Sequence, residues 1–297
     1  MNAGYRNFSS IMAYSGVEYL KTWFATMSWT PMDFQIETWQ AYSQGYSGIV
    51  NAPTGSGKTF SVLLGAMAEH IQNHAEALTS KPNRLLIIWI TPIKALAKEI
   101  LISCEKAIDA FGLSWRAEIR TGDTTTKDKK DQLKHPPEIL IITPESLHVI
   151  LATKGYPAFF QSVQCIVADE WHELVGSKRG VQTELAISAI KCLNQNVRIW
   201  GISATIGNME EAMDVLLFPI PVEKRKLIKG NISKRITVRS VFPDEIESFP
   251  WAGHLGLRLA DKVVEILNSS KTTLIFTNTR AQCEMWYQKL LDIHPDL

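Results

Sequence analysis

A short glycine-rich loop stands between an apolar run and a helical pattern. It spans residues 52–59 and reads Ala-Pro-Thr-Gly-Ser-Gly-Lys-Thr. Its two glycines allow a tight turn in which backbone N–H groups face one point, at the positive end of a helix dipole. Lys58 can then reach the β- and γ-phosphates of a nucleotide, and Thr59 can offer its hydroxyl to Mg²⁺. The residues predicted to form this phosphate-binding loop are Pro53, Thr54, Gly55, Ser56, Gly57, Lys58 and Thr59.

Two adjacent carboxylates, Asp169 and Glu170, follow a second apolar run. Successive side chains of a strand point to opposite sides, so one carboxylate can hold Mg²⁺ while its neighbour faces the attacking water. We assign the metal to Asp169, directly or through water, and the role of general base or water-positioning group to Glu170. Such a pair after a strand is usually solvated surface. Because a phosphate loop precedes it on the same chain, this pair is a specific signal for a nucleotide site.

Alternating apolar runs and helical patterns position these residues. Short β-branched or apolar runs predict buried parallel strands at residues 48–51, 85–90, 138–143, 165–169 and 197–203. Apolar residues that recur every three or four positions predict helices at 59–77, 95–111 and 182–193. The alternation predicts an α/β fold with a doubly wound, mostly parallel sheet, in which ligands bind at the carboxyl ends of the strands.

Bulk properties exclude several classes of protein. The 297 residues are 45% hydrophobic and 21% charged, as in soluble globular proteins, and no apolar run is long enough to span a bilayer, so no membrane partner is expected. The first residues lack the apolar segment of a secretory signal, which predicts a cytoplasmic location. Four cysteines without a C-x-x-C pair fit neither a zinc site nor a disulfide framework. The net charge of +1 restricts any nucleic-acid surface to a local patch.

The alternating pattern breaks after residue 222. Residues 223–239 carry seven Lys or Arg against one acidic residue, which predicts a basic linker or connecting strand region. A helix at 255–267, a strand at 273–276 and a helix at 280–291 then begin a second α/β unit. One strand cannot close a sheet, so we expect a fragment of a longer protein. The expected parts are an N-terminal extension (1–28), a first domain (29–222), a linker (223–250) and an incomplete second domain (251–297).

Seven short motifs occur in the order of motifs I to IV of the superfamily two helicases. They cover residues 52–59, 91–96, 121–123, 143–146, 169–172, 203–205 and 276–280. The longer strings at 169–174, 176–180 and 249–256 resemble the Lhr-type helicases, and most of all the ligase-associated DExH-box branch of DNA-repair helicases. The resemblance runs from about Tyr19 to Leu297. It implies a RecA-like fold for the first domain and the start of a second RecA-like domain after the linker.

The resemblance also implies roles around the nucleotide. Ser203 and Thr205 are expected to link the nucleotide site to strand movement, through hydroxyls that bond His172 or Asp169. Gln35 resembles the Q motif, whose amide can both donate to and accept from adenine, and this predicts a preference for ATP. The alternative for this residue is a surface glutamine beside core aromatic rings. ATP and Mg²⁺ are the implied cofactors.

Contacts with nucleic acid are expected at the loops of motifs Ia, Ib and IV, where short polar side chains and helix N-termini can bond phosphate oxygens without reading bases. Glu145 is expected to cap a helix rather than touch a phosphate. Lys178 and Arg179 are either strand contacts or part of a solvated turn. The residues expected to contact the strand are Thr91, Lys94, Thr143, Ser146, Thr277 and Arg280.

Three functions stay open. In the first, the parent protein is an ATP-dependent DNA helicase or translocase that moves 3′ to 5′ along single-stranded DNA, in repair beside an ATP-dependent ligase and a nuclease. In the second, it is an RNA helicase with a similar core. In the third, this chain is a nucleotide- and strand-binding module without turnover, because motifs V and VI, with their arginine fingers, are not among its 297 residues.

Overall fold

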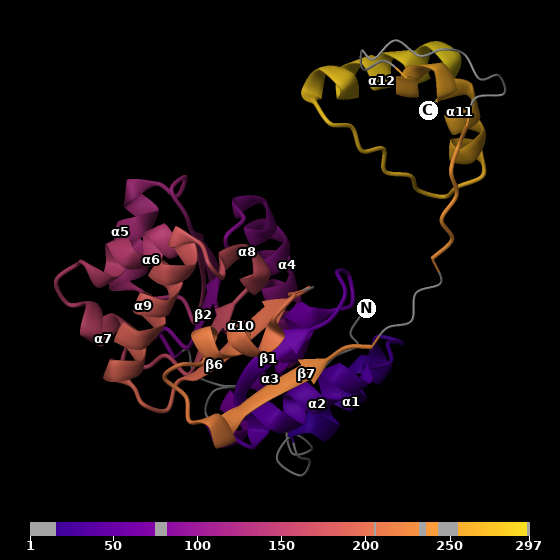
Figure 1. The fold of residues 1–297 in the computed structure, drawn as a ribbon. Helices are drawn as coiled ribbons and strands as arrows, with labels where there is room; N and C mark the ends of the chain where they lie inside the picture. The colour runs from indigo at the N-terminus through magenta and orange to yellow at the C-terminus, as the bar shows by residue number, and fades with distance from the viewer. Residues whose placement is uncertain (1–15, 75–81, 205, 232–235, 243–254, 296–297) are drawn as a thin grey trace. The chain divides into compact units, whose positions relative to one another are not determined.

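The computed structural model describes residues 16–74, 82–204, 206–231, 236–242 and 255–295. The chain divides into two compact units, Met1–Ser233 and Lys234–Leu297. The first unit contains a β-sheet covered by helices on both faces (Figure 1). None of the described helices is long and apolar enough to cross a membrane.

Among the described residues, seven parallel strands form the sheet, in the order β3-β4-β2-β5-β6-β1-β7. Because all of them run the same way, their carboxyl ends lie at one edge. The five predicted strands are confirmed within two residues of their expected bounds, and so is the doubly wound α/β fold. The strands are β1 (Ser47–Asn51), β2 (Ile87–Ile90), β3 (Ala117–Arg120), β4 (Ile139–Ile142), β5 (Cys165–Ala168), β6 (Arg198–Ser203) and β7 (Arg225–Lys229).

Side chains alternate between two apolar layers. Ile87 and Trp89 belong to the core on one face of the sheet, whereas Ile88 and Ile90 belong to the core on the other. Both cores are therefore built from the same uninterrupted apolar strands, as expected for a parallel sheet that is buried on both sides.

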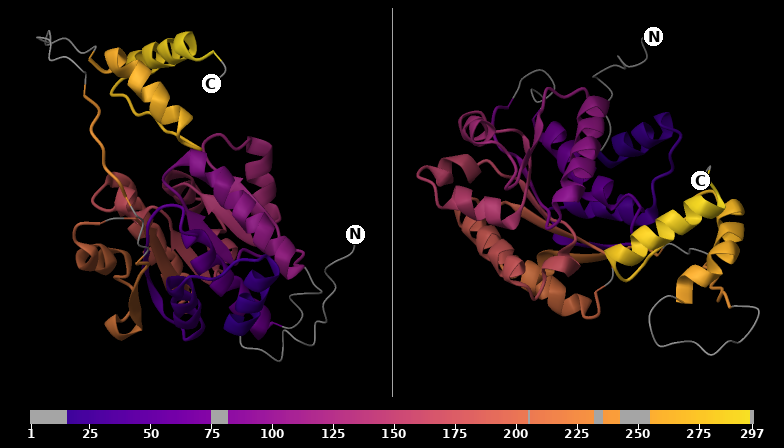
Figure 2. Two further views of the ribbon diagram at one scale, coloured as in Figure 1. Left: turned by 90° about the vertical axis from the view of Figure 1, so that its right-hand side faces the viewer. Right: turned by 90° about the horizontal axis from the view of Figure 1, so that it is seen from above.

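Helices pack on both faces of the sheet, as Figures 1 and 2 show. The three predicted helices are confirmed as α3, α4 and α9, although residues 75–77 of the first lie outside the described residues. The first face carries α1 (Gly16–Thr26), α2 (Asp33–Ser43), α3 (Lys58–Asn73) and α4 (Lys94–Phe111). The second carries α6 (Pro144–Leu151), α7 (Tyr156–Phe160), α8 (Trp171–Leu174), α9 (Lys178–Leu193) and α10 (Met209–Leu216), while α5 (Thr126–Lys134) follows β3.

The two outermost strands, β3 and β7, were not among the predicted strands. Both are short, and β7 lies inside the stretch interpreted as a basic linker or connecting strand region. It pairs with β1 along the edge of the sheet, where Ile228 is fully buried and Lys226 and Lys229 are exposed. Charged side chains are common on edge strands because they hinder pairing with further chains. Residues 225–229 thus extend the sheet of the first unit.

Helix α1 lies within the stretch expected to be an N-terminal extension. Its Leu20 and Phe24 side chains are buried. The ring of Phe24 meets the ring of Trp39 edge-on, with the centroids 5.3 Å apart. Tyr19 stacks on Phe111 of α4 at a centroid distance of 5.3 Å. Helix α1 is therefore part of the core of the first unit.

The described part of the second unit contains a 3-10 helix, η4 (Leu255–Leu259), followed by α11 (Ala260–Asn268) and α12 (Arg280–Ile293). The two predicted helices are confirmed. The predicted strand at 273–276 is wrong, since these residues form no strand. A strand requires backbone partners, and the described residues of this unit provide no neighbouring strand. Leu274 and Phe276 are accordingly 77% and 87% exposed.

Candidate nucleotide site and strand-binding edge

The predicted phosphate loop connects β1 to α3. Gly55 and Gly57 have φ angles of +75° and +79°, in the left-handed region that favours glycine. Gly57 is the N-cap of α3, so the first N–H groups of that helix face the loop. The Ser56 hydroxyl is buried and has no hydrogen-bond partner among the described residues. Backbone donors, a helix N-terminus and an unpaired buried hydroxyl together fit a bound phosphate.

The Lys58 side chain folds back onto the phosphate loop. Its Nζ atom donates to the carbonyl oxygen of Ala52 at 2.8 Å, and the side chain is buried. Burial lowers the pKa of Lys58, and the nearby carboxylates of Glu170 and Asp169 act in the opposite direction. The ammonium group therefore belongs to the same electrostatic site as the acidic pair. Thr59 is the second residue of α3 and is partly buried.

Asp169 stands immediately after β5 and is only 6% exposed. Its Oδ1 atom accepts a hydrogen bond from the backbone N–H of Glu170 at 2.9 Å, and its Oδ2 atom accepts one from Nε1 of Trp89 at 3.1 Å. Burial raises the pKa of Asp169 to about 6, although the Trp89 hydrogen bond and Lys58 lower it. Sequence reasoning missed Trp89, because a tryptophan within an apolar strand has the signature of a core residue.

This donor set fits Mg²⁺, which prefers oxygen ligands. The Asp169 carboxylate and the Thr59 hydroxyl are the groups that would hold the ion. The described residues include no cluster of three His, Cys, Asp or Glu side chains that could hold a metal by itself. Mg²⁺ commonly binds through one or two protein groups together with nucleotide phosphates and water. Bound with ATP, it would supply positive charge to the phosphate oxygens.

Glu170 adopts a left-handed backbone conformation, with φ +46° and ψ +48°, and forms the N-cap of the short helix α8. Few residues other than glycine take this conformation, and it turns the chain sharply after Asp169. The Oε2 atom of Glu170 lies 3.4 Å from Nδ1 of His172. The Ser203 hydroxyl lies 3.3 Å from the same nitrogen. The predicted link between Ser203 and His172 is therefore present, while Thr205 lies outside the described residues.

The end of β6 is also joined to the start of the phosphate loop. The N–H of Ala52 donates to the carbonyl oxygen of Ser203 at 3.2 Å. The side-chain amide of Asn51 donates to the carbonyl oxygen of Ala204. Both contacts follow from the pairing of β1 with β6, in which Asn51 stands opposite Ser203. Asn51 was not predicted as a site residue, since a single asparagine at a strand end gives no distinct signal.

Gln35 is 4% exposed and lies against the phosphate loop. Its Nε2 atom donates to the carbonyl oxygen of Gly57 at 3.1 Å, and its Oε1 atom accepts from the N–H of Met32 at 2.9 Å. The alternative of a surface glutamine is therefore excluded. The amide fixes the loop to the start of α2, and its contact with adenine stays a prediction.

Lys94, Thr143 and Ser146, three residues predicted to contact the nucleic-acid strand, line one hollow of about 360 Å³ at the carboxyl edge of the sheet. Its lining residues are Lys94, Arg120, Gly122, Lys129, Thr143, Glu145, Ser146 and Val149. The Nζ atom of Lys94 forms an ion pair with Oδ1 of Asp123 at 2.8 Å, in the loop after β3. The Thr143 hydroxyl donates to that of Ser146 at 3.0 Å. The loops after β2, β3 and β4 therefore meet around this hollow.

Other predicted contacts lie elsewhere. Thr91 is fully buried, and its hydroxyl lies 3.4 Å from both the N–H and the carbonyl oxygen of Ile93. Thr277 and Arg280 belong to the second unit. There the Thr277 hydroxyl donates to the carbonyl oxygen of Thr279 at 3.2 Å, and Arg280 is the first residue of α12. Strand binding by these three residues stays a prediction.

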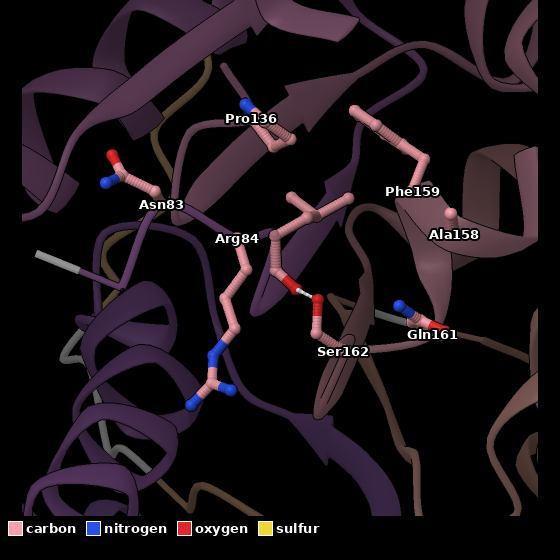
Figure 3. A pocket seen from close by; sticks show the side chains of 8 residues that line it. Asn83, Arg84, Pro136, Ala158, Phe159, Gln161 and Ser162 are labelled. Atoms are coloured by element: carbon pink, nitrogen blue, oxygen red, sulfur yellow. Dashed lines mark hydrogen bonds between the residues drawn. The ribbon is translucent and has the colours of Figure 1, made fainter. Parts of the chain in front are cut away.

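A second hollow, of about 530 Å³, lies at the opposite ends of the strands (Figure 3). Arg84, Pro136 and Phe159 line it, and the Ser162 hydroxyl donates to the carbonyl oxygen of Leu85 at 3.0 Å. None of the predicted site residues belongs to it. The predicted phosphate loop and acidic pair follow β1 and β5 and so lie at the other, carboxyl edge of the sheet.

A phosphate loop after β1, an acidic pair after β5, from which β1 is separated by β6, and a doubly wound sheet define a RecA-like nucleotide-binding domain. The family model of the DEAD/DEAH box helicases matches residues 32–212, more than half of the chain. The protein belongs to this family.

Its relatives include helicases of the predicted type. The chain is 30% identical over 268 residues to the ATP-dependent helicase Lhr-Core of Methanothermobacter thermautotrophicus, a match that covers 85% of this chain and 30% of that protein. It is 26% identical over 292 residues to the Lhr helicase/probable uracil glycosylase of Mycolicibacterium smegmatis, covering 93% of this chain and 18% of the relative. The resemblance to Lhr-type helicases is confirmed. The chain spans less than a third of the length of these relatives.

Solved structures agree with the fold. The helicase Lhr of Mycobacterium smegmatis, bound to single-stranded DNA and AMP-PNP, matches with a TM-score of 0.75 at 24% identity, over 95% of this chain and 36% of that one. The DUF1998 helicase MrfA matches with a TM-score of 0.71 at 21% identity, over 93% and 40% of the two chains.

Proposed function

We propose that this chain is the ATP-binding motor part of an Lhr-type helicase or translocase, which couples ATP hydrolysis to movement along single-stranded DNA. The observation that carries the proposal is the continuous set of contacts at the carboxyl edge. Ala52 in the phosphate loop bonds Ser203, and the Ser203 hydroxyl contacts His172 in the helix after the acidic pair. Such contacts allow the state of the nucleotide to alter the elements around it.

In the proposed reaction, Lys58 leaves the Ala52 carbonyl and binds the β- and γ-phosphates. Glu170 orients the attacking water and accepts its proton. Asp169 and Thr59 would hold a magnesium ion bound with ATP, which would supply positive charge to the phosphate oxygens. His172 lies within 3.4 Å of both Glu170 and Ser203, and so it can report the position of the Glu170 carboxylate to β6.

The relatives favour DNA over RNA as the nucleic acid along which the protein moves. The solved Lhr structure contains single-stranded DNA, and MrfA was also solved bound to DNA. The DEAD-box helicase Mss116 bound to single-stranded RNA matches with a lower TM-score, 0.60, and covers 77% of this chain. An RNA helicase is thus the second candidate. A role in repair beside a ligase and a nuclease is supported by the strings that resemble the ligase-associated branch.

Direct binding tests the proposal. The chain should bind a fluorescent ATP analogue in the presence of Mg²⁺, and it should bind an oligo-deoxythymidine more tightly than the matched oligo-uridine. Lys58→Ala should abolish nucleotide binding, because it removes the cation at the β- and γ-phosphates. Glu170→Gln should retain nucleotide binding, since Lys58 and Asp169 remain. Equal nucleotide affinity in the wild type and Lys58→Ala would refute the assignment of the site, and tighter binding of RNA would favour the second candidate.

A further inference from the structure

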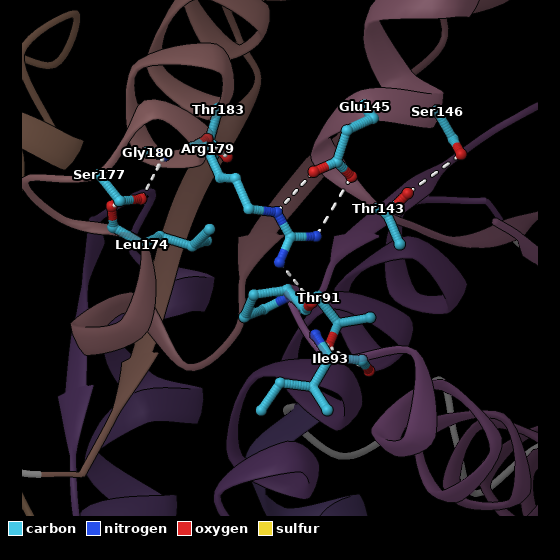
Figure 4. Close-up of polar contacts among 11 residues, drawn as sticks. Thr91, Ile93, Thr143, Glu145, Ser146, Leu174, Ser177, Arg179, Gly180 and Thr183 are labelled. Atoms are coloured by element: carbon cyan, nitrogen blue, oxygen red, sulfur yellow. Dashed lines mark hydrogen bonds and ion pairs between the residues drawn. The ribbon is translucent and has the colours of Figure 1, made fainter. Parts of the chain in front are cut away.

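Arg179, in the first turn of α9, has most of its hydrogen-bonding capacity committed within the protein (Figure 4). Its Nε and Nη2 atoms donate to the two carboxylate oxygens of Glu145, at 2.6 and 3.2 Å. Its Nη1 atom donates to the carbonyl oxygen of Pro92 at 2.7 Å. A guanidinium group holds a carboxylate in this two-pronged way with a defined geometry, which a lysine cannot reproduce.

Both partners of Arg179 lie in loops that carry predicted strand contacts. Pro92 stands between Thr91 and Lys94 in the loop after β2. Glu145 stands between Thr143 and Ser146, at the start of α6, and it lines the 360 Å³ hollow. The Arg179 side chain thus connects the two loops between which the nucleic-acid strand is expected to bind.

The backbone of Arg179 is in turn fixed to the helix that follows the acidic pair. A Cβ atom on Gly180 would lie 2.1 Å from the carbonyl oxygen of Leu174, the last residue of α8. Only glycine allows this approach. The Ser177 hydroxyl accepts a hydrogen bond from the N–H of Gly180 at 3.1 Å and so caps α9 against the same turn. The start of α9 must therefore follow any displacement of α8.

We propose that Arg179 is a positioning residue that holds the loops after β2 and β4 in the arrangement that binds the strand, and connects them to the helix carrying His172. This inference rests on the proposed function, since it requires that the hollow bind a nucleic-acid strand. It differs from both sequence-based interpretations of Arg179, because the partly exposed guanidinium donates three hydrogen bonds to Glu145 and Pro92 within the protein.

The ion pair does not serve mainly to stabilise the fold. The side chains of Arg179 and Glu145 are 37% and 52% exposed, and ion pairs at such exposure add little to folding stability. Pairing also leaves the Glu145 carboxylate neutralised where it lines the hollow, so it repels strand phosphates less. The positioning of the loops and the neutralised charge of Glu145 should therefore both favour binding of the nucleic-acid strand.

The test measures the affinity of the 297-residue chain for a fluorescent oligo-deoxythymidine at several salt concentrations, in Arg179→Gln, Glu145→Gln and the double variant. Each single change should weaken binding by about fivefold to tenfold, and the double variant should bind no worse than either, because all three break the same coupled pair. Arg179→Lys should restore the affinity only in part. The salt dependence should stay at the wild-type slope, whereas loss of a direct phosphate contact would reduce it by about 0.7.

The control is Arg116→Gln, which breaks another arginine–carboxylate pair. Arg116 directly precedes β3 and pairs with Glu118 on that strand, at the end of the sheet away from the hollow. This variant should leave strand affinity unchanged. Affinity for the ATP analogue and the melting temperature should also match the wild type in Arg179→Gln, and a loss of either would mean a general structural role. Stronger binding by Glu145→Gln would show that Arg179 contacts the strand directly and would overturn the inference. Unchanged binding by Arg179→Gln would overturn it too, whereas a wild-type chain that binds no strand would refute the proposed function itself.

Discussion

The indole Nε1 atom of Trp89 donates a hydrogen bond to Oδ2 of Asp169, 3.1 Å away, and both side chains are buried. The register of the sheet explains this contact. Trp89 on β2 stands opposite Val167 on β5, and Asp169 follows two residues after Val167. Alternation along a strand places Val167 and Asp169 on the same face as Trp89. A core residue therefore orients the carboxylate that is proposed to hold magnesium.

Trp89→Phe should lower the affinity of the ATP-bound site for Mg²⁺. It removes a hydrogen bond to a buried carboxylate, which is worth about 1.5 kcal/mol or more, so the Mg²⁺ concentration at half-saturation should rise roughly tenfold. Binding of a fluorescent ATP analogue, titrated with Mg²⁺, measures this shift. Trp200→Phe is the matched control, because Trp200 is equally buried on β6 and its Nε1 atom has no hydrogen-bond partner among the described residues. Equal shifts in the two variants would contradict the proposed role of the indole.

Asp169 should make the nucleotide-free protein less stable at neutral pH than at acidic pH. Its pKa in the folded state is about 6, raised above the usual value of 3.8 by burial, so the folded state favours the protonated form. No penalty exists below the unfolded pKa, where both states are protonated. The penalty develops as the pH rises between the two values and is complete above about 6, where it reaches the order of 1–3 kcal/mol.

Asp169→Asn removes this titration and should therefore raise the free energy of unfolding at pH 7.5, with little gain at pH 4. Asparagine has one carboxamide oxygen for two donors, so the gain should fall below the full penalty. Urea unfolding of both proteins at the two pH values measures the difference. A variant that is less stable than the wild type at pH 7.5 would show that the hydrogen bonds to Asp169 outweigh its burial.

The sequence predicted those parts of the site in which backbone conformation and residue order carry the signal. The loop with Gly55 and Gly57, the acidic pair and the five central strands all have periodicity or spacing of their own. Trp89 and Asn51 could not be predicted, since their roles depend on which strands are neighbours in the sheet. The order β2-β5 and β6-β1 is a tertiary property that no local pattern encodes.

The edge strands show the same limit. On β7 the lysines outnumber the buried side chains, so composition alone indicated a linker as readily as a strand. Residues 273–276 show the converse, because an apolar run in a favourable pattern forms no strand without a partner. The orientation of Arg179 also depended on tertiary structure, since Glu145 and Pro92 are distant from it in sequence.

The ion pair between Lys94 and Asp123 should lower the affinity for the nucleic-acid strand. Both side chains are more than half exposed, and Lys94 is a predicted phosphate contact. Asp123→Asn removes an anion beside the strand and releases the ammonium, so strand affinity should rise by about twofold to fivefold, the range for an ion pair of 0.5–1 kcal/mol. Lys94→Ala should weaken binding evenly across base sequences. Fluorescence anisotropy with oligonucleotides of different sequence tests both changes, and a strong preference for one sequence at fixed salt would contradict phosphate-based contact.

The last prediction concerns turnover by this chain. It should bind ATP with Mg²⁺ but hydrolyse it far more slowly than helicases that contain motifs V and VI, since these motifs are not among its residues. An arginine finger supplied across the cleft between two RecA-like domains is worth about 10³ to 10⁵ in turnover. The phosphate loop, Asp169 and Glu170 cannot replace that charge, because they act on the other side of the nucleotide. Steady-state hydrolysis should therefore stay near the rate of Glu170→Gln, with or without single-stranded DNA. Brisk hydrolysis that DNA stimulates and Glu170→Gln abolishes would show that these residues form a complete catalytic site.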